Sequence, residues 1–148
     1  YLDLVRSVKE RIEAHLHLQE LAGLTDFFDI LEYGVREKLT YLRTMPHSLH
    51  FSLRMYYAGD SGLGIKLQRY TVDLVDRMTE QYFGHVDREK FKPGVTPLQA
   101  LDLLMYLADG YVHMQRMAGR ELDLDEMMEQ YVLWRDMVRQ YVYKEEYQ

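Results

Sequence analysis

Two long amphipathic tracts near the C-terminus constrain this chain more than any other feature. They cover about residues 96–118 and 123–148, and only the short Ala118-Gly119-Arg120 segment separates them. Apolar residues recur in both at helical spacing, so each tract predicts a helix and the pair predicts an antiparallel hairpin. The apolar residues of 123–148 spread over more than one face, and a helix with so wide an apolar arc has to be covered on two sides. The hairpin therefore predicts a homodimer in which a second copy covers the remaining face.

The rest of the chain also has helical patterning. Proline and glycine divide it into tracts of about residues 1–21, 26–45 and 60–84, with a short helix at about 47–58. No tract shows the strict apolar–polar alternation of a half-buried strand. The sequence thus predicts an all-α fold, an antiparallel bundle of about five helices whose last two form the dimerising hairpin.

Several helix boundaries have clear sequence signals. Thr25 or Asp26 can cap the second tract, and Met45-Pro46 ends it because the residue before proline avoids the α region. Thr96-Pro97 predicts a helix start with proline at the first helical position.

Composition limits the classes of protein to which the chain can belong. Its 148 residues fit a single domain, and its net charge of −6 argues against a basic nucleic-acid footprint. No segment has the length of a membrane span or a signal-peptide core, so we expect no membrane partner. The absence of cysteine fits a cytoplasmic protein.

The sequence offers little for catalysis or metal binding. A carboxylate-bridged di-metal bundle needs Glu-x-x-His on two helices, and no glutamate here has a histidine three residues later. His47 and His50 could share a helix face, but surface or pocket histidines are the simpler interpretation. No serine lies in a Gly-x-Ser-x-Gly turn, and cysteine is absent. We therefore expect no enzyme, no cofactor and no metal.

Half-polar side chains on the middle helices and on 96–118 suggest a small-molecule pocket, although aromatic and Met residues at helical spacing are also typical of an ordinary core. A buried Arg54 would need an anionic partner, which could be Asp109, Glu32 or a carboxylated ligand. The candidate pocket residues are His50, Phe51, Arg54, Tyr70, Leu74, Tyr106, Asp109 and His113.

The candidate dimer interface lies on the two C-terminal tracts. Its expected residues are Leu101, Met105, Tyr111, Tyr131, Trp134, Met137, Val138 and Tyr141. A charge at Trp134 would then be buried on association, so Trp134→Glu is expected to disrupt the dimer. Alternatively, Trp134 and the tyrosines only cap the core of one chain.

Several motifs along the chain are similar to those of a known protein family. They are Asp26–Leu31, Met45-Pro46, Tyr82-Phe83, Phe91, Ala100–Tyr106, Asp109–Tyr111, Tyr131–Trp134 and Tyr143–Tyr147. With these motifs, essentially all 148 residues resemble the C-terminal domain of TetR-family transcriptional regulators.

The resemblance implies a homodimer paired through 96–118 and 123–148, and an effector cavity among the preceding tracts and the facing side of 96–118. It implies that 1–21 is the helix linking this domain to an N-terminal helix-turn-helix domain absent from the chain, through which alone DNA would be bound. Such a protein would be a repressor whose effector changes its affinity for DNA. The alternatives are a helical module that binds another protein without a small molecule, and a small helical enzyme or metal-binding bundle.

Overall fold

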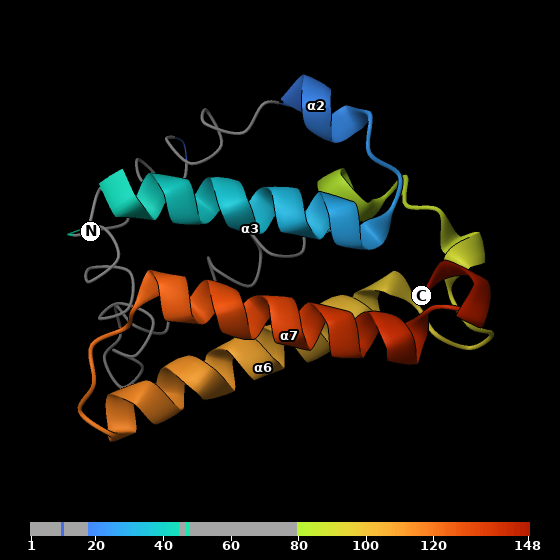
Figure 1. The fold of residues 1–148 in the computed structure, drawn as a ribbon. Coiled ribbons are helices and arrows are strands. Elements are labelled where there is room, and N and C mark those ends of the chain that lie inside the picture. The colour runs from blue at the N-terminus through green and yellow to red at the C-terminus, as the bar shows by residue number, and fades with distance from the viewer. Residues whose placement is uncertain (1–9, 11–17, 45–46, 48–79) are drawn as a thin grey trace, which may run out of the picture. The chain divides into compact units, whose positions relative to one another are not determined.

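The computed structural model describes residues 10, 18–44, 47 and 80–148 (Figure 1). Four α-helices lie in this part: α2 (Leu18–Ala22), α3 (Phe27–Thr44), α6 (Pro97–Met117) and α7 (Leu124–Val142). Two 3₁₀ turns, η1 (Arg88–Lys90) and η2 (Glu145–Tyr147), complete it. The predicted all-α class is confirmed. The predicted helix at 47–58, almost all of that at 60–84 and most of that at 1–21 lie outside the described residues.

The chain forms two compact units. One comprises residues 1–25 with 29–85, and the other comprises residues 26–28 with 86–148. The single effector-binding domain over 1–148 stays a prediction.

The first unit contains α2 and most of α3. Helix α3 buries Leu39 and Leu42, one turn apart in the predicted apolar pattern, and also buries Ile30 on another side of the helix. Nε2 of His85, the last residue of this unit, lies 2.8 Å from the carbonyl oxygen of Leu24, in the turn that follows α2.

The second unit is built on a hairpin of α6 and α7, two helices that lie side by side (Figure 1). Helix α6 starts as predicted. The Thr96 hydroxyl accepts from the backbone N–H of Gln99, the Gln99 side chain accepts from the backbone N–H of Thr96, and Pro97 follows at the first helical position. This reciprocal pair satisfies two backbone donors that the helix itself cannot.

The turn between α6 and α7 depends on one glycine. Gly119 has a φ of +67°, a conformation that costs other residues steric strain. In that conformation the N–H groups of Gly119 and Arg120 donate to the carbonyls of Arg116 and Gln115 and close the end of α6. The carboxylate of Asp123 then accepts from the backbone N–H groups of Asp125 and Glu126 and starts α7.

Helix α7 is shorter than predicted. It ends at Val142, whereas the sequence pattern predicted helix as far as residue 148. Tyr143 is extended, with φ −87° and ψ 149°, and forms an isolated β-bridge with Phe91. The backbone N–H of Lys144 donates to the carbonyl of Lys90, and that of Lys92 donates to the carbonyl of Val142. A tertiary pairing therefore replaces the last helical turns.

Within the described residues, no helix combines the length and the apolar character that crossing a membrane requires.

Candidate interaction surface

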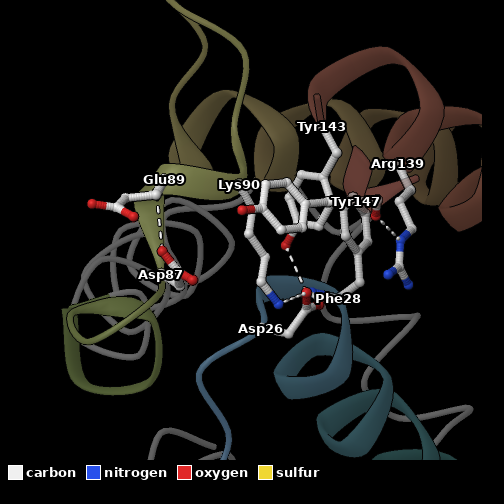
Figure 2. Close-up of polar contacts among 8 residues, drawn as sticks. All are labelled: Asp26, Phe28, Asp87, Glu89, Lys90, Arg139, Tyr143 and Tyr147. Carbon is white, nitrogen blue, oxygen red and sulfur yellow. Dashed lines mark hydrogen bonds and ion pairs between the residues drawn. The ribbon is translucent and has the colours of Figure 1, made fainter. Parts of the chain in front are cut away.

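A buried carboxylate joins three separate segments of the second unit. Asp26 is 6% exposed. Its Oδ1 accepts from the backbone N–H of Phe28 at 2.9 Å, which caps α3. Its Oδ2 accepts from Nζ of Lys90 at 2.9 Å and from the hydroxyl of Tyr143 at 3.2 Å (Figure 2). The carboxylate thus connects the start of α3, the turn η1 and the end of α7. We call Asp26, Lys90 and Tyr143 the clasp.

Aromatic rings surround the clasp. The ring of Tyr143 packs edge-on against Phe28, with centroids 5.0 Å apart, and against Phe91, with centroids 4.9 Å apart. Phe27 continues the cluster, with its ring centroid 5.0 Å from that of Phe28 and 5.8 Å from that of Phe91. Such edge-to-face pairs contribute about 0.5–1.5 kcal/mol each beyond the area they bury.

Arg139 lies over the aromatic cluster. Its guanidinium carbon is 5.6 Å from the centroid of Tyr143 and 5.9 Å from that of Phe28. Its Nε also donates to the carbonyl of Tyr147 at 3.3 Å, so one cation holds the rings and the C-terminal turn together (Figure 2).

The protonation of Tyr143 and the hydrogen bonds that Asp26 accepts indicate that the clasp has a structural role. Burial, reinforced by the charge of Asp26 and its hydrogen bond, raises the pKa of Tyr143 well above its ordinary value. The hydroxyl therefore keeps its proton and donates it to the carboxylate. Since Asp26 accepts from the hydroxyl, from an ammonium group and from a backbone N–H, it is a poor candidate for a general base.

A second feature of this unit is an exposed apolar stripe along α6. Leu103, Leu107, Gly110, Met114 and Met117 follow one another at spacings of four, three, four and three residues, and all five are exposed. This spacing places them on a single face of the helix. We call them the α6 stripe; Tyr106, which is 71% exposed, lies beside it.

Helix α7 has a matching stripe. Gln130, Trp134, Met137 and Tyr141 are spaced by four, three and four residues, and Leu133 lies next to them. Met137 is 61% exposed and Tyr141 is 69% exposed. We call these five residues the α7 stripe.

The two stripes meet along the seam of the hairpin. The rings of Tyr111 on α6 and Trp134 on α7 pack edge-on, with centroids 5.6 Å apart. Tyr111 lies one turn from both Leu107 and Met114, and Trp134 belongs to the α7 stripe itself. The stripes therefore flank the same seam and form one apolar surface, which we call the hairpin face. Burial, with the nearby Glu126 carboxylate as a second cause, raises the pKa of Tyr111.

The predicted interface residues fall into three groups. Leu101, Tyr131 and Val138 are buried within the chain, so they contribute to its own core. Met137 and Tyr141 are exposed on the hairpin face, where half-buried Tyr111 and Trp134 form the seam. Met105 is also exposed, but it lies two residues after Leu103 and so on another side of α6. None of the five residues of the α6 stripe was among the predicted interface residues.

Only part of the predicted pocket lies in the described residues. Tyr106, Asp109 and His113 are spaced by three and four residues on one side of α6, and all three are exposed. The other predicted pocket residues lie outside the described part of the chain: His50, Phe51, Arg54, Tyr70 and Leu74. Among the residues described, no group of three or more His, Asp or Glu side chains is arranged to hold a metal ion.

The clasp was not predicted from the sequence. Asp26 was expected as a helix cap, and Asp26, Phe91 and Tyr143 belong to motifs of the family resemblance, but neither prediction brings them together. No local pattern signals a contact between residues 117 positions apart.

Comparisons of the chain with family models, with curated proteins and with solved structures found no match.

Proposed function

We propose that this chain is the dimerisation and effector-sensing domain of a TetR-like transcriptional repressor, and that two copies pair through the hairpin face. The observation that supports the pairing is the exposure of the α6 stripe and of Leu133, Met137 and Tyr141 in the α7 stripe. Large exposed side chains of Leu, Met and Tyr gather there on adjacent helices, and contiguous apolar patches on soluble proteins are commonly sites of association.

The hairpin face has the form that helical association requires. Apolar positions at alternating spacings of three and four residues pack between the side chains of a facing helix. Two such helices from each copy would make a four-helix arrangement, a common architecture for apolar helix pairs. Burying one Leu or Met side chain fully contributes about 1.5–3 kcal/mol, so the exposed residues of the two stripes can supply a large driving force.

The effector-sensing part of the proposal comes from the family resemblance. In that scheme a small molecule binds within the domain, and the residues linking it to a DNA-binding domain shift in response. Binding at the two sites is then coupled, so the effector lowers the affinity for DNA. Tyr106, Asp109 and His113 on α6 would contribute polar groups to the effector site.

Analytical ultracentrifugation of the purified chain tests the pairing. We expect a species of twice the 17.8 kDa chain mass. Met137→Glu and Met114→Glu are each expected to weaken association at least about 100-fold, because a charge would be buried without a partner. These positions suit the test better than Trp134, whose contact with Tyr111 also holds the hairpin together.

Glu129→Lys is the matched control, because Glu129 is exposed on α7 outside the stripe. It should leave the association constant unchanged, and circular dichroism should show that all variants keep their helices. A wild-type chain that stays monomeric up to millimolar concentration would refute the pairing and favour docking of a different protein on this face. Native mass spectrometry of the same sample should show a small molecule retained by each subunit if the domain senses one.

A further inference from the structure

One residue of the α6 stripe, Gly110, is not explained by the part of the chain that the structure describes. Gly110 lies in the middle of the 21-residue helix α6, where glycine costs about 1 kcal/mol relative to alanine. Its φ is not positive, so the backbone does not require glycine. Among the described residues, a Cβ atom built there would meet no atom within 4 Å, so their packing does not require glycine either.

The surroundings of Gly110 suggest that the absence of a side chain there allows a second helix to approach closely. Gly110 is exposed at the centre of a stripe of large apolar side chains. The distance between two packed helix axes depends on the side chains at the point of contact. A glycine at that point lets a second backbone approach closely.

The stripe is also nearly symmetric about Gly110. Leu103 and Met117 lie seven residues to either side of it, while Leu107 and Met114 lie three and four residues away. A two-fold axis that passes between the Gly110 residues of two copies would therefore set Leu103 of one copy against Met117 of the other. It would also set Leu107 against Met114. Such a self-complementary patch is what an isologous dimer needs.

The charges beside the stripe support the same arrangement. Asp102 lies eight residues before Gly110, and Arg116 lies six residues after it, on the same flank of the helix. In an antiparallel crossing Asp102 of one copy meets Arg116 of the other, so two pairs of opposite charges come together, while the two Asp109 carboxylates, on the same flank beside the glycines, meet near the two-fold axis.

We propose that a second copy of this chain crosses α6 at Gly110, with the two α6 helices antiparallel and the two glycines facing each other on the two-fold axis. This inference rests on the proposed dimerisation and adds its register and its point of closest approach.

Substitutions at Gly110 test the crossing by sedimentation equilibrium. Gly110→Leu is expected to raise the dimer dissociation constant at least 30-fold, because its side chain would separate the helices. Gly110→Ala should weaken the dimer less while raising the stability of the monomer. Gly34→Ala is the control: Gly34 is also inside a helix, with nothing within 4 Å of a built Cβ atom, and should leave association unchanged.

Cross-linking gives a second, independent measurement in a chain that contains no cysteine. With helix axes about 9 Å apart and Cα atoms about 2.3 Å from each axis, facing Gly110 positions fall near the span of about 4.4–6.8 Å that a disulfide bridges. Gly110→Cys should therefore form a disulfide-linked dimer under mild oxidation, whereas Glu129→Cys should not.

A charge exchange tests the antiparallel register. Asp102→Arg and Arg116→Asp should each weaken the dimer about tenfold, and the double variant should recover most of the loss.

The outcomes separate the two proposals. A monomeric wild-type chain refutes the dimer and the crossing together. If the wild type dimerises and Met137→Glu disrupts the dimer, but Gly110→Leu associates as tightly as the wild type and Gly110→Cys does not cross-link, the crossing alone is overturned.

Discussion

At the residue scale, Asp26 shows how one side chain can serve both local and distant structure. Its Oδ1 caps α3 two residues away, and its Oδ2 binds Lys90 and Tyr143. The local role was readable from the sequence, because aspartate before an apolar helical run is a common cap. The contacts with Lys90 and Tyr143 were not readable, because an aspartate at this position looks the same in the sequence whether or not it also forms a buried ion pair.

The clasp should make a measurable contribution to stability. Asp26→Ala leaves the ammonium of Lys90 and the hydroxyl of Tyr143 without this acceptor. The cost of about 3–5 kcal/mol for breaking a fully buried ion pair is an upper bound here, because the Lys90 side chain is 25% exposed. Tyr143→Phe removes one hydrogen bond and keeps the ring, which costs about 1 kcal/mol. Urea denaturation of both variants measures the difference. A cost for Asp26→Ala no greater than that for Tyr143→Phe would contradict the assigned role.

Burial on the hairpin is also decided residue by residue. Leu101, Tyr131 and Val138 belong to the same apolar pattern as Met137 and Tyr141, yet the first three are buried and the last two are exposed. Helical periodicity identifies an apolar arc but does not divide it between the chain's own core and a partner. That division requires the position of the neighbouring helix.

At the element scale, helix boundaries with local causes were predicted and those with tertiary causes were not. Thr96-Pro97 and Ala118-Gly119-Arg120 mark the two ends of α6 within a residue, because capping and a left-handed glycine are local chemistry. The end of α7 at Val142 was wrongly placed. Its apolar pattern continues, but the bridge between Tyr143 and Phe91 takes the backbone out of the helix.

Two glycines should respond to alanine in opposite directions. Gly119→Ala forces a side chain into a positive φ and should lower the free energy of unfolding by about 1–2 kcal/mol. Gly34→Ala, inside α3 and with open space at its Cβ position, should raise it by up to about 1 kcal/mol. Thermal unfolding of the two variants tests this pair. A stabilising Gly119→Ala would contradict the turn assigned to the end of α6.

At the scale of the whole molecule, the all-α class and the C-terminal hairpin followed from the sequence, because they depend on patterns repeated over many residues. The contacts that close the second unit did not, because Asp26, Lys90 and Tyr143 come from distant segments. The predicted pocket could be followed only at Tyr106, Asp109 and His113 among the described residues.

Stability should fall at alkaline pH through the clasp. The pKa of Tyr143 is raised in the folded state, so above the unfolded value of about 10 the folded chain keeps a proton that the unfolded chain has lost. The unfolded state then binds fewer protons, and the free energy of unfolding decreases with rising pH by up to about 1.4 kcal/mol per unit for this group. The contribution is complete below about pH 10.

Urea unfolding at about pH 8 and about pH 11 measures this dependence. Tyr143→Phe removes the titrating group, so its loss of stability between the two pH values should be smaller than that of the wild type. Equal losses would show that Tyr143 does not carry the effect.

The 117-residue separation between Asp26 and Tyr143 also has a consequence for the order of events during synthesis. The ribosome releases residue 26 long before residue 143, so the Asp26 carboxylate cannot accept from the Tyr143 hydroxyl while most of the chain emerges. Contacts so distant in sequence are closed late, because the entropy of closing the loop opposes them. The clasp can therefore close only after residue 143 has been synthesised, and we expect a nascent chain stalled before it to lack the Tyr143 ring that packs against Phe28.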